Sequence, residues 1–296
     1  MGTESLDNRY KALDTRDSRE VAALVLDAQQ RGLDAVQARL DAIALAADAT
    51  ASRLAGSASG RLIYAGAGTS VRLGVQDGVE LTPTFGWPAD RLGFAIAGGL
   101  PALTRAIEGA EDDTAAGTAA IETLDVGPDD VCIAVSASGR TPYTCAACSA
   151  ARDRGALTIG IANNSAAPLL AVSQHPILID SGAEPVAGST RMTAGTTQKI
   201  TLNLLSTLTM IRLGRVYDGM MVDVIATNEK LVVRSLGMVR DIAGVDETAA
   251  RAALAAANGH VKLAALVALG QSAAAGRDLL ARHGGNLRAA LAALGR

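Results

Sequence analysis

The sequence predicts an α/β protein built on a parallel sheet. Short apolar runs that end in Gly or Ser alternate with helix-like segments through the middle of the chain, which is the pattern of consecutive βαβ units. Hydrophobic residues make up 49% of the 296 residues and aromatic ones only 2%, so small aliphatic side chains must fill the interior, which suits helices layered on a buried sheet. After Asp223 the sequence is helical throughout, so we expect a small helical C-terminal domain.

The segment ahead of the sheet carries Ala, Val and Leu at helical spacing over residues 17–56 and predicts one or two amphipathic helices. Five expected strands follow, at residues 61–68, 93–99, 130–138, 156–163 and 175–181. Residues 194–213 form one long expected helix, apolar on most faces, which indicates burial in the domain or at a subunit contact. The expected domains are an N-terminal helical lead-in at 1–56, a sheet domain at 57–224 and a helical domain at 225–296.

Charge and hydropathy exclude several classes of partner. The net charge is −3, and Lys and Arg are scattered, so we expect no nucleic acid partner. Apolar stretches such as residues 202–213 carry polar interruptions and fall short of the roughly 20 residues of a membrane span. The N-terminus lacks the pattern of a signal peptide, and three cysteines argue against a disulfide framework. We therefore expect a cytoplasmic protein without a membrane partner.

The first candidate site is GAGTS at residues 66–70, directly after an expected strand and before a helix. Gly68 lets the backbone approach a ligand closely, and the N–H groups of Thr69 and Ser70 at a helix start favour an anion. Val71 breaks the GxGxxG spacing, so a dinucleotide site is disfavoured. The alternative is an ordinary strand-to-helix turn with Thr69 or Ser70 as the N-cap.

The second candidate site is SASGRT at residues 136–141, again between a strand and a helix. The hydroxyls of Ser136, Ser138 and Thr141 surround Gly139 and can donate to a phosphate without a metal. No P-loop lysine or magnesium motif accompanies them, so phosphoryl transfer is disfavoured. We expect a phosphorylated sugar as the ligand, chemistry other than phosphoryl transfer, and neither metal nor cofactor.

An ordered series of segments between Thr3 and Leu231 resembles the N-acetylmuramic acid 6-phosphate etherases. These belong to the sugar isomerase (SIS) domain proteins, to which glucokinase regulatory protein is a more distant relative. The matching segments are TES near the start, GRLIYAGAGTS, PTFG, EGAEDD, SASGRTPY, GSTRMTAGTTQK and MVDVIATNEKL, with HGG around Gly284 as a weak extension. The resemblance implies a flavodoxin-like, three-layer SIS-type sandwich and a homodimer in which the helical tail helps to close the neighbouring subunit's pocket.

The resemblance also implies the roles of particular residues. It makes Glu80 in DGVELTPTF and Glu111 in EGAEDD the catalytic acids, and Glu108 a ligand of a sugar hydroxyl. Glu184 and Ser189 would border the sugar pocket. On their own, such acids are ordinary solvated helix residues. Glu108 and Glu111 stand three residues apart on an expected helix end, where they can share a face.

The reaction that the resemblance implies is cleavage of the C3 lactyl ether of N-acetylmuramic acid 6-phosphate. A base removes the C2 proton of the ring-opened aldehyde, lactate leaves from C3, and water adds across the double bond to give N-acetylglucosamine 6-phosphate and D-lactate. A carboxylate can act as the base and then as the acid. The alternatives are a phosphosugar-binding regulator without catalysis and an SIS-type aldose–ketose isomerase.

Several residues depart from the family pattern or invite other roles. Val71 stands where the family has Gly and would tighten the loop if the backbone there needed a positive φ. Cys145 and Cys148 form a CxxC that we interpret as helix packing, and the three histidines are too far apart in sequence to be joint ligands. Lys262 is expected to be an exposed helix lysine, with a phosphate contact from a neighbouring subunit as the alternative.

Overall fold

A computed structural model describes residues 2–226 and 228–296, so Thr227 in the last matching segment lies outside the described residues. The chain forms two compact units. The first contains the residues up to Gly78 and Asp90–Ser206, and the second contains Val79–Ala89 and Thr207–Arg296. Spatial packing thus groups residues 79–89 with the C-terminal helices, whereas the division at residues 56 and 224 stays a prediction from the sequence.

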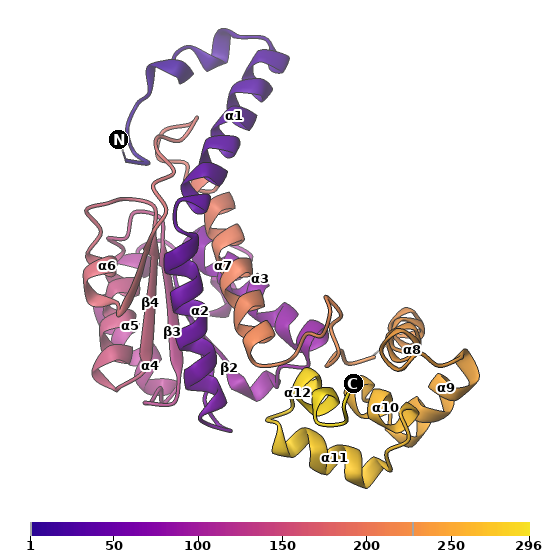
Figure 1. The fold of residues 1–296 in the computed structure, drawn as a ribbon. Helices are drawn as coiled ribbons and strands as arrows, with labels where there is room; N and C mark the ends of the chain where they lie inside the picture. Colours follow the sequence, from indigo (N-terminus) through magenta and orange to yellow (C-terminus); the bar gives the residue numbers. More distant parts are fainter. Residues whose placement is uncertain (1, 227) are drawn as a thin grey trace. The chain divides into compact units, whose positions relative to one another are not determined.

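A five-stranded parallel sheet forms the centre of the first unit (Figure 1). The strands lie in the order β2-β1-β3-β4-β5, the flavodoxin-like arrangement that the family resemblance implied. Every pair of neighbours is parallel. All five expected strands are confirmed, at β1 Leu62–Gly66, β2 Leu92–Ile96, β3 Val131–Ser136, β4 Leu157–Ala162 and β5 His175–Leu178.

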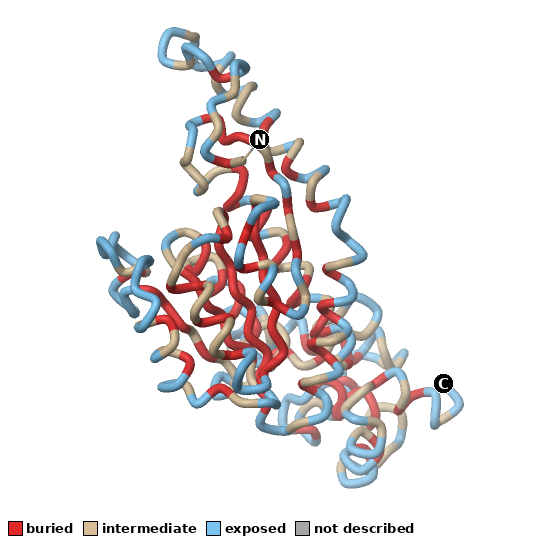
Figure 2. Tube along the Cα trace, turned by 90° about the vertical axis from the view of Figure 1, so that its left-hand side faces the viewer, coloured by how far each residue is buried: buried red, intermediate tan, exposed pale blue. Residues whose placement is uncertain are grey.

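The central strands are buried along their whole length, as expected for a sheet covered on both faces (Figure 2). On one face Ile63 and Ala134 pack in a cluster with Ile121 of α4 (Thr114–Thr123) and Ala147 of α5 (Pro142–Asp153). Helix α2 contacts the sheet through β3, β4 and β5. Cys148 belongs to the same buried cluster and the half-buried Cys145 packs against it, which supports the interpretation of this pair as packing residues.

The first unit also carries the expected lead-in helices and the long helix. Helix α1 is capped by Asp17, whose side chain accepts hydrogen bonds from the backbone N–H groups of Arg19 and Glu20. Helices α3 and α7 begin in this unit and end in the second one. The helices are α1 Ser18–Gln37, α2 Leu40–Ala55, α3 Gly68–Phe85, α4 Thr114–Thr123, α5 Pro142–Asp153, α6 Pro168–Val172 and α7 Thr193–Arg212, with 3₁₀ helices at Asn8–Tyr10, Leu13–Thr15, Leu100–Leu103 and Ala110–Asp112.

Five helices follow Asp223 in the described part of the second unit, as the sequence there predicted. They are α8 Glu229–Ala243, α9 Glu247–Ala256, α10 Val261–Ala268, α11 Ala273–Arg282 and α12 Leu287–Ala292. A 3₁₀ helix, Ala89–Arg91, begins at the last residue of the segment 79–89 and continues in the first unit. Asp246 and Ser272 cap two of them with their side chains. Six consecutive residues of α10, 261–266, are buried, so this helix forms the centre of the unit.

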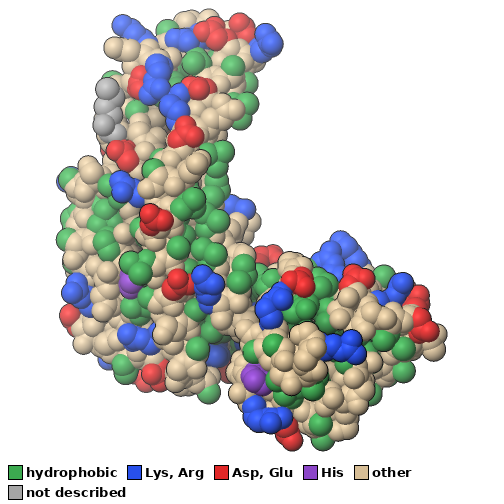
Figure 3. All heavy atoms as spheres, viewed as in Figure 1, with side chains coloured by type: hydrophobic (Ala, Val, Ile, Leu, Met, Phe, Trp, Pro, Cys, Tyr) green, Lys and Arg blue, Asp and Glu red, His purple; other side chains and the backbone are tan. Residues whose placement is uncertain are grey.

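Charge is spread over the surface without a basic patch on the face that Figure 3 shows, where Lys and Arg alternate with Asp and Glu. No helix among the described residues is long and apolar enough to cross a membrane.

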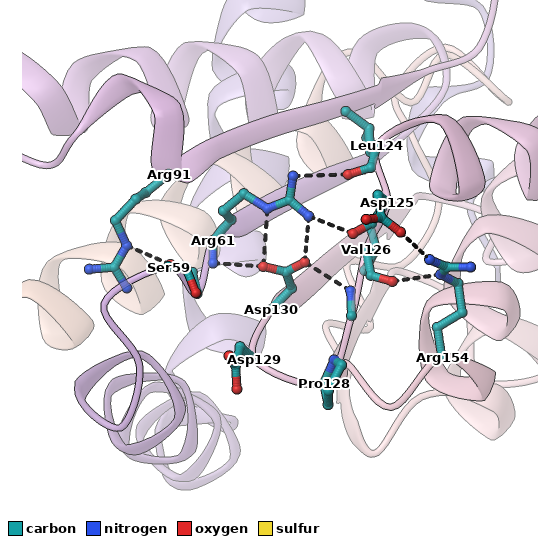
Figure 4. A network of polar contacts seen from close by, with 12 residues as sticks. Ser59, Arg61, Arg91, Leu124, Asp125, Val126, Pro128, Asp129, Asp130 and Arg154 are labelled. Carbon is teal, nitrogen blue, oxygen red and sulfur yellow. Dashed lines mark hydrogen bonds and ion pairs between the residues drawn. The ribbon is translucent and has the colours of Figure 1, made fainter.

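A polar network ties the strand starts together at the sheet edge where β1 and β3 begin (Figure 4). Arg61 precedes β1 and Asp130 precedes β3. The Arg61 Nη2 atom lies 2.7 Å from Asp130 Oδ2, and the backbone N–H of Arg61 donates to Asp130 Oδ1 at 2.8 Å. Arg61 also donates to the carbonyl oxygens of Leu124 and Asp125, at 2.9 Å each. The Asp130 side chain is only 6% exposed, so this ion pair is a buried structural element.

Candidate functional site

The candidate site lies where the order of the strands reverses. Strand β2 lies next to β1 on one side, and β3 lies next to β1 on the other side. The chain therefore leaves β1 in one direction along the sheet and leaves β3 in the opposite direction, so the loops that follow these two strands diverge. Ligands of open parallel sheets bind in the crevice at such a switch point, beyond the carboxyl ends of the strands. Gly66 at the end of β1 pairs with Val135 near the end of β3. The fold therefore brings the two Ser/Thr-rich loops side by side.

The first loop turns directly into α3. Gly68 has a φ of +54°, a conformation that favours glycine, and it begins the helix. Thr69 is half-buried, and Ser70 is buried. Val71 lies in the first turn of α3, and its backbone N–H donates to the carbonyl oxygen of Ala67 at 3.3 Å. The backbone there is helical, so the β-branched side chain does not strain the loop.

The second loop is shaped by its own hydroxyls. Ser136 Oγ lies 2.9 Å from Thr141 Oγ1 and 3.4 Å from Ser138 Oγ. The backbone N–H of Gly139 donates to Ser136 Oγ at 3.1 Å, and that of Arg140 donates to Ser138 Oγ at 3.1 Å. The three hydroxyls thus gather at the start of α5, where the helix dipole favours an anion.

Glycine is required at position 139. Its φ is +63°, and a Cβ atom built there would lie 2.3 Å from the Cβ atom of Ala167. A larger residue would therefore push the loop away from the turn before α6.

A cavity of about 480 Å³ opens beside the second loop. It is lined by residues from the N-terminus and from the ends of β3, β4 and β5, namely Gly2, Glu4, Ser138, Arg140, Asn164, Ser165, Ala166 and Asp180. Of the predicted residues only Ser138 lines it. Sequence reasoning missed Arg140, Asn164 and Asp180, although polar residues after parallel strands were a usable signal.

Asn164 holds the N-terminal TES segment at this cavity. Its Oδ1 atom accepts the backbone N–H of Thr3 at 3.0 Å, and its Nδ2 group donates to Thr3 Oγ1 at 3.0 Å. The same Nδ2 group donates to the carbonyl oxygen of Ala137 at 2.9 Å. The backbone N–H of Gly188 donates to the Thr3 carbonyl oxygen at 3.1 Å, which joins the segment to the loop before α7.

Glu184 has a structural role that the sequence did not reveal. The side chain is buried, and its two carboxylate oxygens accept the backbone N–H groups of Thr193 and Ala194 at 2.9 and 2.8 Å. Glu184 therefore caps α7, where a negative charge is favourable. Ser189 is half-buried in the same loop, and its backbone N–H donates to the Val186 carbonyl oxygen. Their contact with a sugar stays a prediction.

The two predicted catalytic acids, Glu80 and Glu111, and the predicted sugar ligand Glu108 are exposed. Glu80 lies on α3, in the part of that helix that belongs to the second unit. Glu108 lies in a turn and Glu111 in a 3₁₀ helix of the first unit. The expectation that Glu108 and Glu111 share a helix face is wrong, because Gly109 with a φ of +71° separates them and breaks the helical path.

A buried carboxylate on α3 was missed. Asp77 accepts hydrogen bonds from Tyr64 Oη at 2.8 Å, Asn203 Nδ2 at 2.6 Å and Ser206 Oγ at 3.0 Å. Burial raises the pKa of Asp77, although these hydrogen bonds act in the opposite direction. The cluster connects β1, α3 and α7 and so fixes the helix that starts at the first loop.

Lys262 is buried, although the sequence predicted an exposed helix lysine. It is only 8% exposed, and its Nζ atom lies 2.5 Å from Asp223 Oδ2 and 2.8 Å from the carbonyl oxygen of Gly285. The interpretation as an exposed helix lysine is wrong, because α10 lies at the centre of the second unit.

Two family models match parts of this chain. The model of the glucokinase regulatory protein N-terminal SIS domain matches residues 44–152, and that of the SIS domain matches residues 115–211. A solved phosphoheptose isomerase from Francisella tularensis matches with a TM-score of 0.48 and 16% identity, over 68% of this chain and 98% of that chain.

Two relatives match at much higher identity. N-acetylmuramic acid 6-phosphate etherase from Streptomyces coelicolor is 49% identical over 238 residues, which cover 79% of this chain and 76% of the relative. The protein of the same name from Deinococcus radiodurans is 47% identical over 290 residues, which cover 98% of this chain and 94% of the relative. With such identity along nearly the whole sequence, the chain belongs to the N-acetylmuramic acid 6-phosphate etherase family.

Proposed function

We propose that this protein is an enzyme that cleaves the lactyl ether of N-acetylmuramic acid 6-phosphate, releasing N-acetylglucosamine 6-phosphate and D-lactate. The observation that carries the proposal is the pair of hydroxyl-rich loops at the strand switch point, in a chain 47% identical to an etherase over 98% of its length. The reaction makes the protein a carbon–oxygen lyase of cell-wall sugar recycling in the cytoplasm.

The loops supply the binding part of the mechanism. The hydroxyls of Ser136, Ser138 and Thr141 gather at the start of α5, and Thr69 and Ser70 stand in the first turn of α3. A phosphate between the two loops would accept hydrogen bonds from both, with the positive ends of two helices towards it. Neutral donors hold the phosphate without activating it, which suits a reaction at C2 and C3 of the sugar.

The acids supply the proton transfers. In the proposed elimination, Glu80 takes the C2 proton of the open aldehyde, the C2–H electrons form the C2–C3 double bond, and the C3–O bond breaks. The lactate oxygen takes up a proton as it leaves. Water then adds its oxygen at C3, and C2 regains a proton. Both steps need a positioned carboxyl group that accepts and returns a proton, and Glu111 is the second candidate for this work.

Incubation with N-acetylmuramic acid 6-phosphate and an assay of D-lactate test the proposal directly. The etherase is expected to release one D-lactate for each N-acetylglucosamine 6-phosphate. A phosphosugar-binding regulator would bind the compound and release no lactate. An aldose–ketose isomerase would release no lactate and would interconvert a ketose and an aldose phosphate.

Replacing Ser136 and Ser138 together with Ala is expected to weaken binding of the phosphorylated sugar by at least about tenfold, since hydrogen bonds to a charged group are lost. Affinity for the unphosphorylated sugar should change little. Calorimetric titration of both sugars measures the two effects. Ser57→Ala with Ser59→Ala removes an exposed hydroxyl pair whose Oγ atoms lie 3.2 Å apart, and serves as the control. Equal losses for both sugars would show that Ser136 and Ser138 only support the loop.

The proposal includes a homodimer. Helix α1 has only three buried residues, and Leu26 and Leu33, seven positions apart on one side, are 60% and 49% exposed. A second copy that covers this side would remove both side chains from water. Sedimentation velocity at micromolar concentration is expected to give the mass of a dimer, and Leu26→Glu with Leu33→Glu is expected to shift it towards the monomer. A wild-type monomer would contradict the proposal.

A further inference from the structure

The second unit contains a cavity of about 780 Å³ that has no role in the proposed reaction. Its walls are the segment after α7, the turn between α9 and α10, and the turn between α11 and α12. All of its lining residues belong to this unit.

The cavity wall carries an excess of positive charge. Arg215, Lys262 and Arg277 line it, whereas Asp223 is its one carboxylate among the described residues. Three cations against one anion leave an excess of two positive charges when His260 is neutral. The Lys262 and Arg215 side chains are only 10% and 20% exposed, so water solvates their charges poorly, whereas Arg277 is exposed.

The Lys262 ammonium group uses two of its three N–H donors in hydrogen bonds to described residues. Its side chain donates to Asp223 Oδ2 and to the carbonyl oxygen of Gly285, at 2.5 and 2.8 Å. An ammonium group has three N–H donors, and two have acceptors among the residues that the structure describes. The third is available to a ligand in the cavity. Burial, the largest cause, lowers the pKa of Lys262, although the ion pair with Asp223 acts in the opposite direction.

The Arg215 guanidinium is held in place by hydrogen bonds from its Nη1 group. Its Nη1 group donates to the carbonyl oxygens of Phe85 and Gly86, at 2.7 and 2.9 Å, and its guanidinium stacks 5.1 Å from the centre of the Trp87 ring. Asp223 Oδ2 lies 3.9 Å away. Within the described part of the chain, every hydrogen bond of Arg215 uses Nη1, so Nε and Nη2 remain for an oxyanion, which suits the planar fork of arginine.

The start of α10 adds backbone donors. His260 occupies the N-cap position, and its side chain makes no capping hydrogen bond. The backbone N–H of Ala264, which donates to the His260 carbonyl oxygen at 2.8 Å, makes the first hydrogen bond of the helix. The N–H groups of the three preceding residues, 261–263, lie before that bond, and all three residues line the cavity.

We propose that this cavity is a second ligand site, which binds a compact oxyanion, a phosphate or a carboxylate group, of a small organic molecule. Lys262, Arg215 and the first turn of α10 hold the anion. Apolar side chains such as Leu213, Val222 and Val224 also line the cavity and accommodate the body of the molecule. The proposal goes beyond the etherase reaction and does not depend on it.

Phosphate titrations of the full-length protein test the proposal. Inorganic phosphate is expected to occupy two sites in the wild type, and one each in Ser136→Ala with Ser138→Ala and in Lys262→Met. The triple variant is expected to bind none. Hydrogen exchange should show protection by phosphate at residues 257–263 that persists in the Ser variant and is lost in Lys262→Met. Titration with D-lactate distinguishes a carboxylate from a phosphate as the anion that the site prefers.

Lys262→Met leaves Asp223 with a weaker partner and could therefore disturb the fold. A second pair of variants tests the site without changing this buried ion pair. Arg277 and Arg282 are both exposed on α11, but only Arg277 lines the cavity. Arg277→Gln is expected to weaken phosphate binding at the second site by about threefold to tenfold, and Arg282→Gln to leave it unchanged. Equal effects of the two variants would overturn the proposal. Loss of all phosphate binding in the Ser136→Ala, Ser138→Ala variant would also overturn it, because a single site would then account for the ligand.

Discussion

Glu80→Gln is expected to lower the turnover of N-acetylmuramic acid 6-phosphate by at least about a hundredfold, the usual contribution of a general acid or base. Glutamine keeps the shape of the side chain but can neither accept the C2 proton nor return it. Glu80 is exposed on α3, so its loss leaves no buried partner unsatisfied and the fold should persist. The measurement is the initial rate of D-lactate release at saturating substrate, together with a binding titration that is expected to change little.

Glu122→Gln provides the control, because Glu122 is an exposed acid on α4 without a proposed role. It should keep wild-type turnover. If a folded Glu80→Gln enzyme also turned over at the wild-type rate, Glu80 could not be the base, and the proton transfer would have to be assigned to Glu111.

The sheet could be predicted from the sequence because its pattern is local. A strand that is buried on both faces is mostly apolar, as β3 and β4 are, and each such run is followed by a turn-forming segment. The position of the two loops follows from the same pattern, because carboxyl ends of adjacent parallel strands meet at one edge. Ser136 and Thr69 could therefore be placed at the same edge of the sheet before any contact was known, and their contact with a ligand stays a prediction.

The contacts that the sequence did not reveal are between residues far apart in the chain. Asn164 is 161 residues from Thr3, and Asp77 is 126 residues from Asn203. Glu184 caps a helix that begins nine residues later, outside the spacing of a local cap. Lys262 was misplaced because a lysine in an Ala-rich helix resembles a surface residue until its partner Asp223 is known. Periodicity reports which side of an element is buried, but it does not report which polar side chains meet there.

Asp130→Ala is expected to lower the free energy of unfolding by about 3 kcal/mol, because it leaves the Arg61 guanidinium partly buried without its carboxylate. The change also removes the acceptor of the Gly127 backbone N–H, which donates to Asp130 Oδ2 at 3.0 Å. Urea unfolding at pH 7, followed by circular dichroism, measures the loss. Asp129→Ala is the matched control, since Asp129 is the exposed neighbour and, among the described residues, its side chain accepts one surface hydrogen bond, from Ser57.

The pH dependence gives a second test of the same ion pair. Burial acts to raise the pKa of Asp130, but the hydrogen bonds from Arg61 and Gly127 outweigh it, so the pKa is lowered from its ordinary value of 3.8. A carboxyl with a lowered folded-state pKa stabilises the protein above its unfolded pKa, and the contribution is lost as the pH falls through the folded pKa. The difference in unfolding free energy between wild type and Asp130→Ala should therefore be largest at neutral pH and shrink below about pH 4. A difference that stays constant down to pH 3, or one no larger than that of Asp129→Ala at pH 7, would show that the pair contributes packing without electrostatic stabilisation.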